Sequence, residues 1–195
     1  MKEIKRRKEI NREKFEDFAY IIDFLPYGYP DDKRPIHKRE PIAQVVGEKF
    51  FTLLEVSVKK DVNPLVMDRV YIGKDLEKRD VVNRIKRRLR FDQLTPTSKS
   101  ELPFVLEKIV KSQEERFVEF FNKSESITTR LHQLELLPGI GKKTMWAIIE
   151  ERKKEPFKSF EDIAKRVKIQ PEKCIVQRII YELQNPNTKY KLFTA

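Results

Sequence analysis

One turn constrains the fold of this chain more than any other segment. Residues Leu136–Lys143 read Leu-Leu-Pro-Gly-Ile-Gly-Lys-Lys, and two of the 5 glycines of the sequence lie there. Apolar residues recur at helical spacing on both sides, so we expect the turn to join two helices. These residues are Leu131, Leu134 and Leu137 before the turn and Met145, Ile148 and Ile149 after it.

The second of these helices begins with the features of an anion site. Glycine permits a positive φ or a close approach of a ligand to the backbone. The free amides and the dipole at a helix N-terminus attract anions, and Lys142 and Lys143 add positive charge there. An ordinary tight turn with a C-cap glycine is the alternative. The candidate nucleic-acid-binding residues of this segment are Pro138, Gly139, Ile140, Gly141, Lys142 and Lys143.

Leu136–Lys143 resembles the helix-hairpin-helix motif, which binds the nucleic-acid backbone without sequence specificity. Residues Glu150–Arg152 and Pro156–Ile163 resemble the linker between paired hairpins in small DNA-binding domains. A degenerate second hairpin follows at Val167–Ile180, where the glycines are missing. We expect this second hairpin to complete the hydrophobic core and to bind phosphate poorly.

The charge of the chain agrees with a nucleic-acid partner. Lys and Arg number 42 against 31 Asp and Glu, a net charge of +11. Such a surplus favours nucleic acid or an anionic surface as partner, while a solvated basic surface is the alternative. The single Cys174 excludes an internal disulfide and indicates a reducing, cytoplasmic location. No apolar run predicts a membrane span or a signal peptide.

The hydrophobic patterns predict an α+β fold with two domains. Residues 1–14 are interpreted as a flexible basic arm, and residues 15–94 as a small β-barrel of the OB or SH3-like kind. Residues 95–195 are interpreted as a helical domain that carries the helix-hairpin-helix motif. The predicted strands are Phe18–Leu25, Pro41–Val46, Phe50–Lys59 and Val66–Ile72.

Residues Val81–Phe91 fit either a strand or a helix, and we favour the strand. As a strand, the segment places Lys86, Arg88 and Arg90 on one face, opposite Ile85, Arg87 and Leu89. We therefore add Lys86, Arg88 and Arg90 to the candidate nucleic-acid-binding residues, against the alternative of a solvated basic face.

The sequence predicts no catalytic residues, no metal site and no cofactor. His37 and His132 lack ligand spacing to Cys174, which we interpret as a small buried hydrophobe. The pair Asp31-Asp32 indicates turn chemistry. Two aromatic features stay open at this point. The Tyr27-Gly28-Tyr29 loop could stack on unpaired bases or pack back onto the barrel, and Trp146 could pack or contact nucleic acid.

Nearly the full chain resembles an archaeal family of predicted RNA-binding proteins that joins a small N-terminal β-barrel to a helix-hairpin-helix region. The segments that carry the resemblance are Asp23–Gly28, Phe117–Asn122, Ile127–His132 and Leu136–Lys143. The resemblance implies a role in RNA or ribosome metabolism and supplies no catalytic residues. It favours RNA over DNA, with ribosomal or RNA-polymerase-associated proteins as further partners. The alternatives are a DNA-binding accessory subunit of a repair or nuclease system, and a structural partner of a ribosomal or polymerase complex.

Overall fold

The computed structural model describes residues 15–195, so the predicted basic arm at residues 1–14 lies outside the described part. The chain divides into two compact units. The first runs to Val105 and includes Phe193–Ala195, and the second spans Leu106–Leu192. The division falls inside helix α2 (Pro96–Ser112), whereas the sequence analysis divided the chain at residues 94 and 95.

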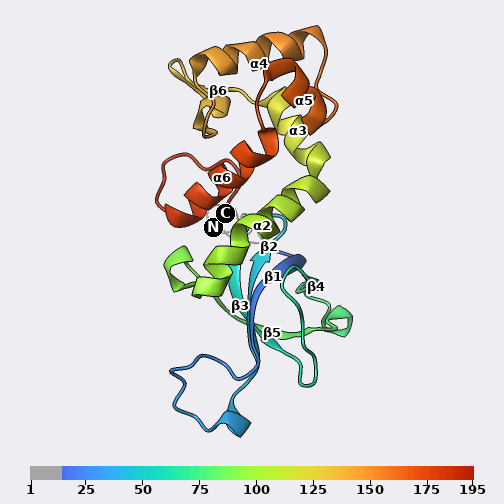
Figure 1. Ribbon diagram of the computed structural model, residues 1–195, viewed down its shortest axis with the longest axis vertical. Helices are drawn as coiled ribbons and strands as arrows, with labels where there is room; N and C mark the ends of the chain where they lie inside the picture. Colours follow the sequence, from blue (N-terminus) through green and yellow to red (C-terminus); the bar gives the residue numbers. More distant parts are fainter. Residues whose placement is uncertain (1–14) are drawn as a thin grey trace, which may run out of the picture. The chain divides into compact units, whose positions relative to one another are not determined.

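The first unit contains a curled antiparallel sheet with the strand order β4-β1-β2-β3-β5 (Figure 1). Its strands are β1 (Phe18–Leu25), β2 (Ile42–Gly47), β3 (Leu53–Val58), β4 (Arg69–Tyr71) and β5 (Val82–Arg88). The strand prediction for residues 81–91 is therefore confirmed over β5. Within residues 15–195 no pairing joins β4 to β5, so the sheet forms an open half-barrel and not a closed barrel.

Alternation along the strands places the core of this unit on one face of the sheet. The core residues come from all five strands and their flanks: Ala19, Ile21, Ala43, Val45, Leu54, Val56, Val58, Val70, Ile72 and Val82. Strands β2 and β3 are buried along their whole length, so side chains on the other face are covered as well. Polar residues on that second face need hydrogen-bond partners. Within residues 15–195 Gln44 and Glu55 have them, whereas the buried Ser57 Oγ has none.

Gln44 shows how that second face holds the start of α2. Its side chain is fully buried, and its Oε1 accepts hydrogen bonds from Thr95 N at 3.0 Å and Ser98 Oγ at 2.7 Å. Thr95 Oγ1 in turn accepts a hydrogen bond from Ser98 N at 3.0 Å, which caps the helix. The predicted change from β to helical texture near residue 95 thus coincides with a helix N-terminus fixed to the sheet.

The second unit is mainly helical. Beyond α2 the helices are α3 (Glu114–Lys123), α4 (Lys142–Lys154), α5 (Phe160–Val167) and α6 (Pro171–Gln184). Two short strands, β6 (Ser126–Thr128) and β7 (Leu131–His132), form a hairpin, and the 3-10 helix η4 (Gln133–Leu136) follows it. The chain is therefore a mixed α+β protein, as the sequence predicted.

The predicted helix before the turn is wrong, because residues 131–136 form β7 and η4. Only Leu134 lies within η4, whereas Leu131 belongs to β7 and Leu137 is the C-cap residue, so the three leucines do not share one helix. Two side-chain hydrogen bonds also fix the tight turn. His132 Nδ1 accepts from Leu134 N at 3.1 Å, and Glu135 Oε2 accepts from His132 N at 2.8 Å.

The degenerate second hairpin is a turn between two α-helices. Helix α5 ends at Val167, and Lys168 adopts a left-handed conformation with φ 63°. Pro171 then occupies the first position of α6, where its missing amide is harmless. Ser159 caps α5 by accepting a hydrogen bond from Asp162 N at 3.1 Å, as its sequence context predicted.

Candidate functional site

The predicted turn is anchored by apolar residues and open at its glycines. Leu137 and Ile140 are buried, and Ile140 N donates a hydrogen bond to Leu137 O at 3.1 Å. Gly139 has φ +83°, a conformation that residues with a Cβ rarely adopt. A Cβ added to Gly139 or Gly141 would meet no atom of residues 15–195 within 4 Å. The backbone of the turn is therefore accessible to a ligand from the side on which the glycines lie.

Helix α4 begins at this open backbone. Gly141 is its N-cap residue, and Gly141 O accepts the first helical hydrogen bond, from Met145 N at 2.9 Å. Within residues 15–195 the amides of Lys142, Lys143 and Thr144 have no acceptor, as is usual for a first helical turn. The first turn of α4 also carries no acidic side chain. The N-terminus of α4 thus presents uncompensated donors and the positive end of the helix dipole.

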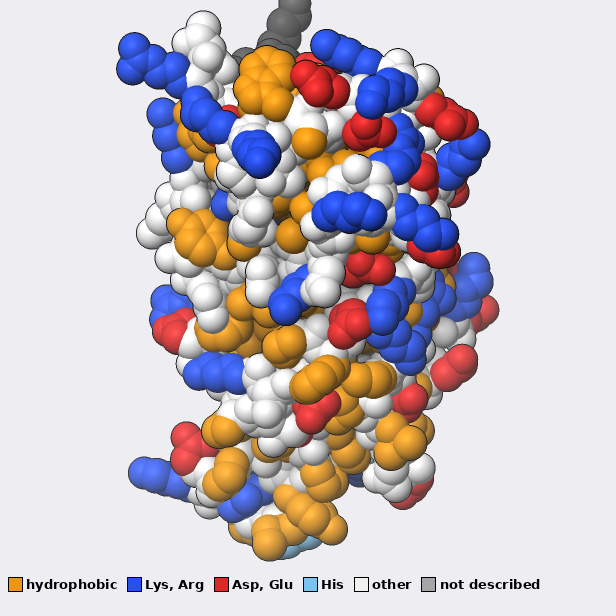
Figure 2. Space-filling view, turned by 45° about the horizontal axis from the view of Figure 1, so that its top comes forward, with side chains coloured by type: hydrophobic (Ala, Val, Ile, Leu, Met, Phe, Trp, Pro, Cys, Tyr) orange, Lys and Arg blue, Asp and Glu red, His pale blue; other side chains and the backbone are white. Residues whose placement is uncertain are grey.

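Lys142 and Lys143 differ from the ion-paired lysines of the second unit. Lysines on neighbouring helices form ion pairs, such as Lys123 with Glu119 and Lys165 with Glu161. Within residues 15–195, Lys142 and Lys143 are exposed and pair with no carboxylate. Figure 2 shows one face of the molecule, on which Lys and Arg side chains are scattered among acidic and hydrophobic ones. Unpaired cations beside free amides therefore set this turn apart from the mixed surface.

Trp146 lies on the exposed side of α4. Its side chain is 56% exposed, so the alternative that it packs into the core is wrong. Residues three and four positions apart share a helix face, which puts Trp146 on the same face as Lys142 and Lys143. The chain has 1 Trp. Its fluorescence is therefore a specific probe of anything that binds at the start of α4.

A buried ion pair, which the sequence analysis missed, holds the residue before the turn. Arg178 on α6 donates to Glu182 Oε1 at 2.8 Å and to Leu136 O at 3.2 Å. Both side chains are almost completely buried. Tyr190 O accepts a further hydrogen bond from Arg178, and Glu182 Oε1 accepts one from Leu192 N at 2.6 Å. An arginine and a glutamate four residues apart among the apolar residues of α6 were the only sequence signal for this support.

His132 is a second supporting residue. The imidazole is buried, and burial together with the charge of Arg152 lowers its pKa. The neutral ring is needed because Nδ1 accepts the Leu134 amide that closes η4. Protonation would remove this acceptor one residue before the 3-10 helix that leads into the turn.

We expect acid to destabilise the second unit through His132. The unfolded imidazole, with a pKa of about 6.5, binds a proton more readily than the folded one. The contribution of His132 to the free energy of unfolding is therefore fully present above about pH 6.5 and is lost as the pH falls below that value. His132→Asn keeps an acceptor and does not titrate, so its free energy of unfolding should depend less on pH between about 5 and 7. Urea unfolding followed by Trp146 fluorescence measures this, and identical pH dependence in both proteins would contradict it.

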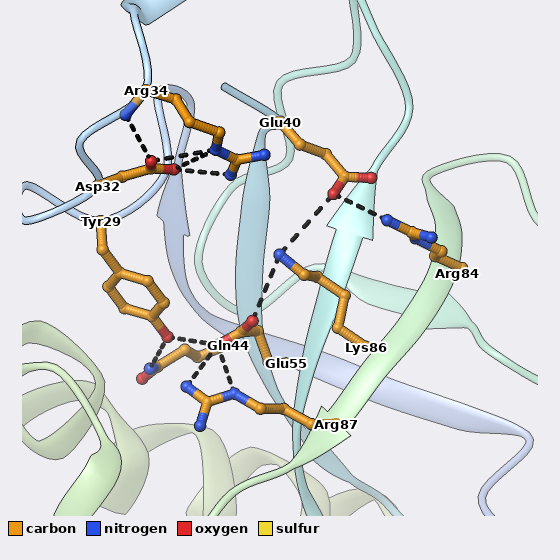
Figure 3. Close-up of polar contacts among 9 residues, drawn as sticks. All are labelled: Tyr29, Asp32, Arg34, Glu40, Gln44, Glu55, Arg84, Lys86 and Arg87. Atoms are coloured by element: carbon orange, nitrogen blue, oxygen red, sulfur yellow. Dashed lines mark hydrogen bonds and ion pairs between the residues drawn. The ribbon is translucent and has the colours of Figure 1, made fainter. Parts of the chain in front are cut away.

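The basic residues of β5 have partners, and their predicted alternation is wrong. The register between β3 and β5 shifts between Glu55 and Val56, which leaves Lys86 without an opposite residue. Such a bulge lets neighbouring side chains point the same way. Both Lys86 and Arg87 consequently reach the buried Glu55, at 3.5 and 3.0 Å (Figure 3).

The remaining residues of the predicted basic face are also engaged. Arg88 donates to Ala195 O at 2.9 Å, and Arg90 forms an ion pair with Asp92 at 3.1 Å. Lys86 approaches Glu40 as well, at 3.7 Å. The structure therefore does not gather Lys86, Arg88 and Arg90 into one unpaired cationic patch, in contrast to Lys142 and Lys143.

The two tyrosines of the loop between β1 and β2 have separate environments. Tyr29 Oη donates to Glu55 Oε2 at 2.7 Å and accepts from Gln44 Nε2 at 2.9 Å (Figure 3). Burial and the hydrogen bond to Glu55 raise the pKa of Tyr29. Tyr27, on the other side of Gly28, is 63% exposed. Tyr29 therefore packs back onto the sheet, which confirms that alternative for this ring, and stacking of Tyr27 on a base stays a prediction.

Other polar groups do not assemble into a metal site. Among residues 15–195 no group of three His, Cys, Asp or Glu side chains could hold a metal ion. Arg34 binds both carboxylate oxygens of Asp32 and lowers its pKa to about 2, as expected of turn chemistry. Burial raises the pKa of the Cys174 thiol, which disfavours the thiolate. Over the same residues no helix is long and apolar enough to cross a membrane.

Comparison with known proteins places this geometry in a family. Residues 15–195 match the family described as "Protein of unknown function (DUF655)". The chain is 48% identical over 187 residues to the uncharacterized protein MJ0038 of Methanocaldococcus jannaschii. The aligned residues cover 95% of this chain and 83% of that protein. It is 70% identical to Af1531 of Archaeoglobus fulgidus, whose crystal structure superposes with a TM-score of 0.87 over 92% of this chain and 100% of that one. The similarity therefore extends over both units.

Proposed function

The chain belongs to this family of archaeal proteins of unknown function, and we propose from the geometry of its turn that it is a non-enzymatic nucleic-acid-binding protein. The turn at Pro138–Lys143 binds the phosphate backbone, and RNA is favoured over DNA. The observation that carries the proposal is the combination of open glycines, free amides and two unpaired lysines at the start of α4.

In this proposal the turn is a helix-hairpin-helix variant. Helix α4 is the second helix of the hairpin, and η4 takes the place of the first. The turn between α5 and α6 is the degenerate partner hairpin, with Lys168 where a glycine would give an open backbone. The half-barrel of the first unit is a relative of the small OB or SH3-like barrels that occur in nucleic-acid-binding proteins.

The chemistry of the donors predicts what the turn recognises. Main-chain amides and lysine ammonium groups bind phosphate oxygens and do not read base edges. Binding is consequently insensitive to sequence, and it weakens with salt because bound phosphates release counterions. RNA is favoured by the family resemblance and by the exposed Trp146, since unpaired bases stack on aromatic rings.

The test is a salt titration of the wild type and of Lys142→Ala/Lys143→Ala on several unrelated RNAs and DNAs. Each lost phosphate contact lowers the log–log slope by about 0.7 to 0.9. The double variant should therefore lose roughly 1.4 to 1.8 from the slope on every sequence. Quenching of Trp146 fluorescence reports binding at the turn directly.

The matched control is Lys158→Ala/Lys165→Ala, which removes the same charge from the same unit. Lys158 and Lys165 are exposed but paired with Glu155 and Glu161. This control should change the slope much less than the Lys142/Lys143 variant does. Equal salt slopes for both double variants, or a loss of affinity confined to one sequence, would show that the turn has only a structural role and does not bind the phosphate backbone.

The same titration separates the alternatives. Tighter binding to duplex DNA than to any RNA would favour an accessory subunit of a repair or nuclease system. Cleavage of the labelled strands in the presence of Mg²⁺ would contradict the non-enzymatic assignment. Weak binding to all nucleic acids would favour a structural partner of a ribosomal or polymerase complex, with protein as the main contact.

A further inference from the structure

The loop between β1 and β2, residues 26–41, is long for a connection between two paired antiparallel strands. Hairpin loops usually have two to five residues, and much longer ones are commonly functional or disordered. This loop has internal order. Arg34 binds Asp32 at 2.7 Å, and Arg39 Nε donates to Arg34 O at 2.7 Å. The short 3-10 helix η1 (Ile36–Lys38) lies within it (Figure 1).

The base of the loop is fixed to the sheet by the Tyr29 hydroxyl. Glu55 Oε2 on β3 accepts a hydrogen bond from that hydroxyl, and Arg87 on β5 donates a hydrogen bond to the same carboxylate oxygen at 3.0 Å. Gln44 Nε2 on β2 donates a hydrogen bond to the hydroxyl at 2.9 Å. Three strands thus determine where Tyr29 lies, and the position of the adjacent loop residues follows from it.

Gly28 separates the anchored tyrosine from the exposed one. Its φ of +68° reverses the chain between Tyr27 and Tyr29, and a side chain would rarely adopt this conformation. Gly28 N donates a hydrogen bond to Leu25 O at 3.2 Å, and Tyr27 lies within this turn with its side chain exposed. An aromatic ring that is already positioned loses little conformational entropy when a flat ligand stacks on it.

The charges of the loop that carries Tyr27 indicate the class of that ligand. Arg34 neutralises Asp32, while Arg84 at 3.3 Å and Lys86 at 3.7 Å engage Glu40. Within residues 15–195, Lys33 and Lys38 are exposed and have no carboxylate partner. Among the described residues Asp31 also forms no ion pair and opposes these two lysines, so unpaired cations exceed unpaired anions in the loop.

We propose that this loop is a second nucleic-acid contact, in which Tyr27 stacks on an unpaired base and Lys33 and Lys38 bind the flanking phosphates. The inference rests on the proposed function and narrows its ligand to RNA with single-stranded segments. Duplex RNA keeps its bases stacked inside the helix, so Tyr27 contributes only where bases are unpaired.

The experiment measures the affinity of the full chain for two labelled probes, an oligouridine of roughly ten nucleotides and an RNA duplex of similar length. Tyr27→Ala should lower affinity for the single strand by about five- to 150-fold, the range expected for loss of one stacked base. Affinity for the duplex should stay within about twofold. Tyr27→Phe, which keeps the ring, should bind both probes as the wild type does. Phe104→Ala removes another exposed ring outside the loop and should change neither affinity.

Two outcomes overturn the inference: an unchanged affinity of Tyr27→Ala for the single strand, or an equal loss on both probes. The inference and the proposed function fail separately. If only Lys142→Ala/Lys143→Ala weakens binding, with Trp146 quenching lost, the turn binds nucleic acid and the loop does not. If only Tyr27→Ala weakens binding, the loop is the contact and the proposed role of the turn is wrong.

Discussion

Arg178→Met is expected to lower the free energy of unfolding of the second unit by about 3 to 5 kcal/mol. The variant leaves the Glu182 carboxylate buried without its cation, with the Leu192 amide as a remaining donor. It also removes the donor to Leu136 O and Tyr190 O. The loss of the cation beside Glu182 and the loss of a donor at two carbonyls act in the same direction.

A double-mutant cycle separates the buried charge from the lost hydrogen bonds. Arg178→Met/Glu182→Leu removes both charges, so it should be more stable than Arg178→Met alone. Lys165→Met is the matched control, because Lys165 and Glu161 are also four residues apart but are exposed. It should cost less than about 1 kcal/mol. Urea unfolding followed by Trp146 fluorescence reports on the unit that contains all of these residues.

If Arg178→Met lowers the free energy of unfolding by less than about 1 kcal/mol, water or a rearrangement stabilises the Glu182 carboxylate in place of Arg178, and the prediction is wrong. The functional consequence is separate from stability. Because Arg178 holds the carbonyl of Leu136, just before the turn, the variant should also weaken nucleic-acid binding under conditions where it remains folded. Quenching of Trp146 at a temperature well below unfolding measures this second effect.

Gly139→Val is expected to weaken nucleic-acid binding more than the loss of both lysines does. Its φ of +83° is strained for a β-branched residue by about 1 to 3 kcal/mol. The new side chain would also occupy the open space beside Gly139, two residues before Gly141, the N-cap residue of α4. Loss of even one charge-assisted hydrogen bond to phosphate, about 1.5 to 3 kcal/mol, corresponds to roughly a ten- to 150-fold loss of affinity.

Gly139→Asn separates strain from obstruction. Asparagine tolerates positive φ better than valine does, so this variant should keep most of the stability. Its side chain still stands over the turn, so it should lose most of the affinity that Gly139→Val loses. Affinity like the wild type in Gly139→Asn would mean that ligands do not approach the backbone at this residue. Circular dichroism and urea unfolding of each variant show whether the fold is intact.

Local pattern was sufficient for the strands of the first unit. Residues 18–25 form β1 within the predicted limits, because β-branched and aromatic residues ended at a Pro-Tyr-Gly-Tyr-Pro break. The ambiguous segment at 81–91 became a strand because β3 offers it a partner, and pairing outweighs a weak helical spacing. Closure of the barrel was not predictable, since it depends on whether the edge strands β4 and β5 meet.

Local pattern was less sufficient near the turn. The glycines and lysines of Leu136–Lys143 predicted an exposed turn before α4, and the structure has one. The segment before it was assigned to the wrong kind of helix. Leu131 and Leu137 lie outside η4, and the hydrogen bond from Leu134 N to His132 Nδ1 that fixes η4 cannot be recognised from the spacing of the leucines.

The sequence by itself determined the strands of the first unit, the change to helices near residue 95 and the open glycine turn. Backbone propensity, glycine conformation and hydrophobic period act over a few neighbouring residues, which is why these features could be predicted. Only the tertiary structure decided which charges are free. Lys86, Arg88 and Arg90 looked like Lys142 and Lys143 in the sequence, yet a β-bulge and distant groups engage the former within residues 15–195. It also anchored Tyr29 and left Tyr27 in solvent. Whether a charge or ring is available depends on partners far away in the chain, and these become neighbours only when the chain has folded.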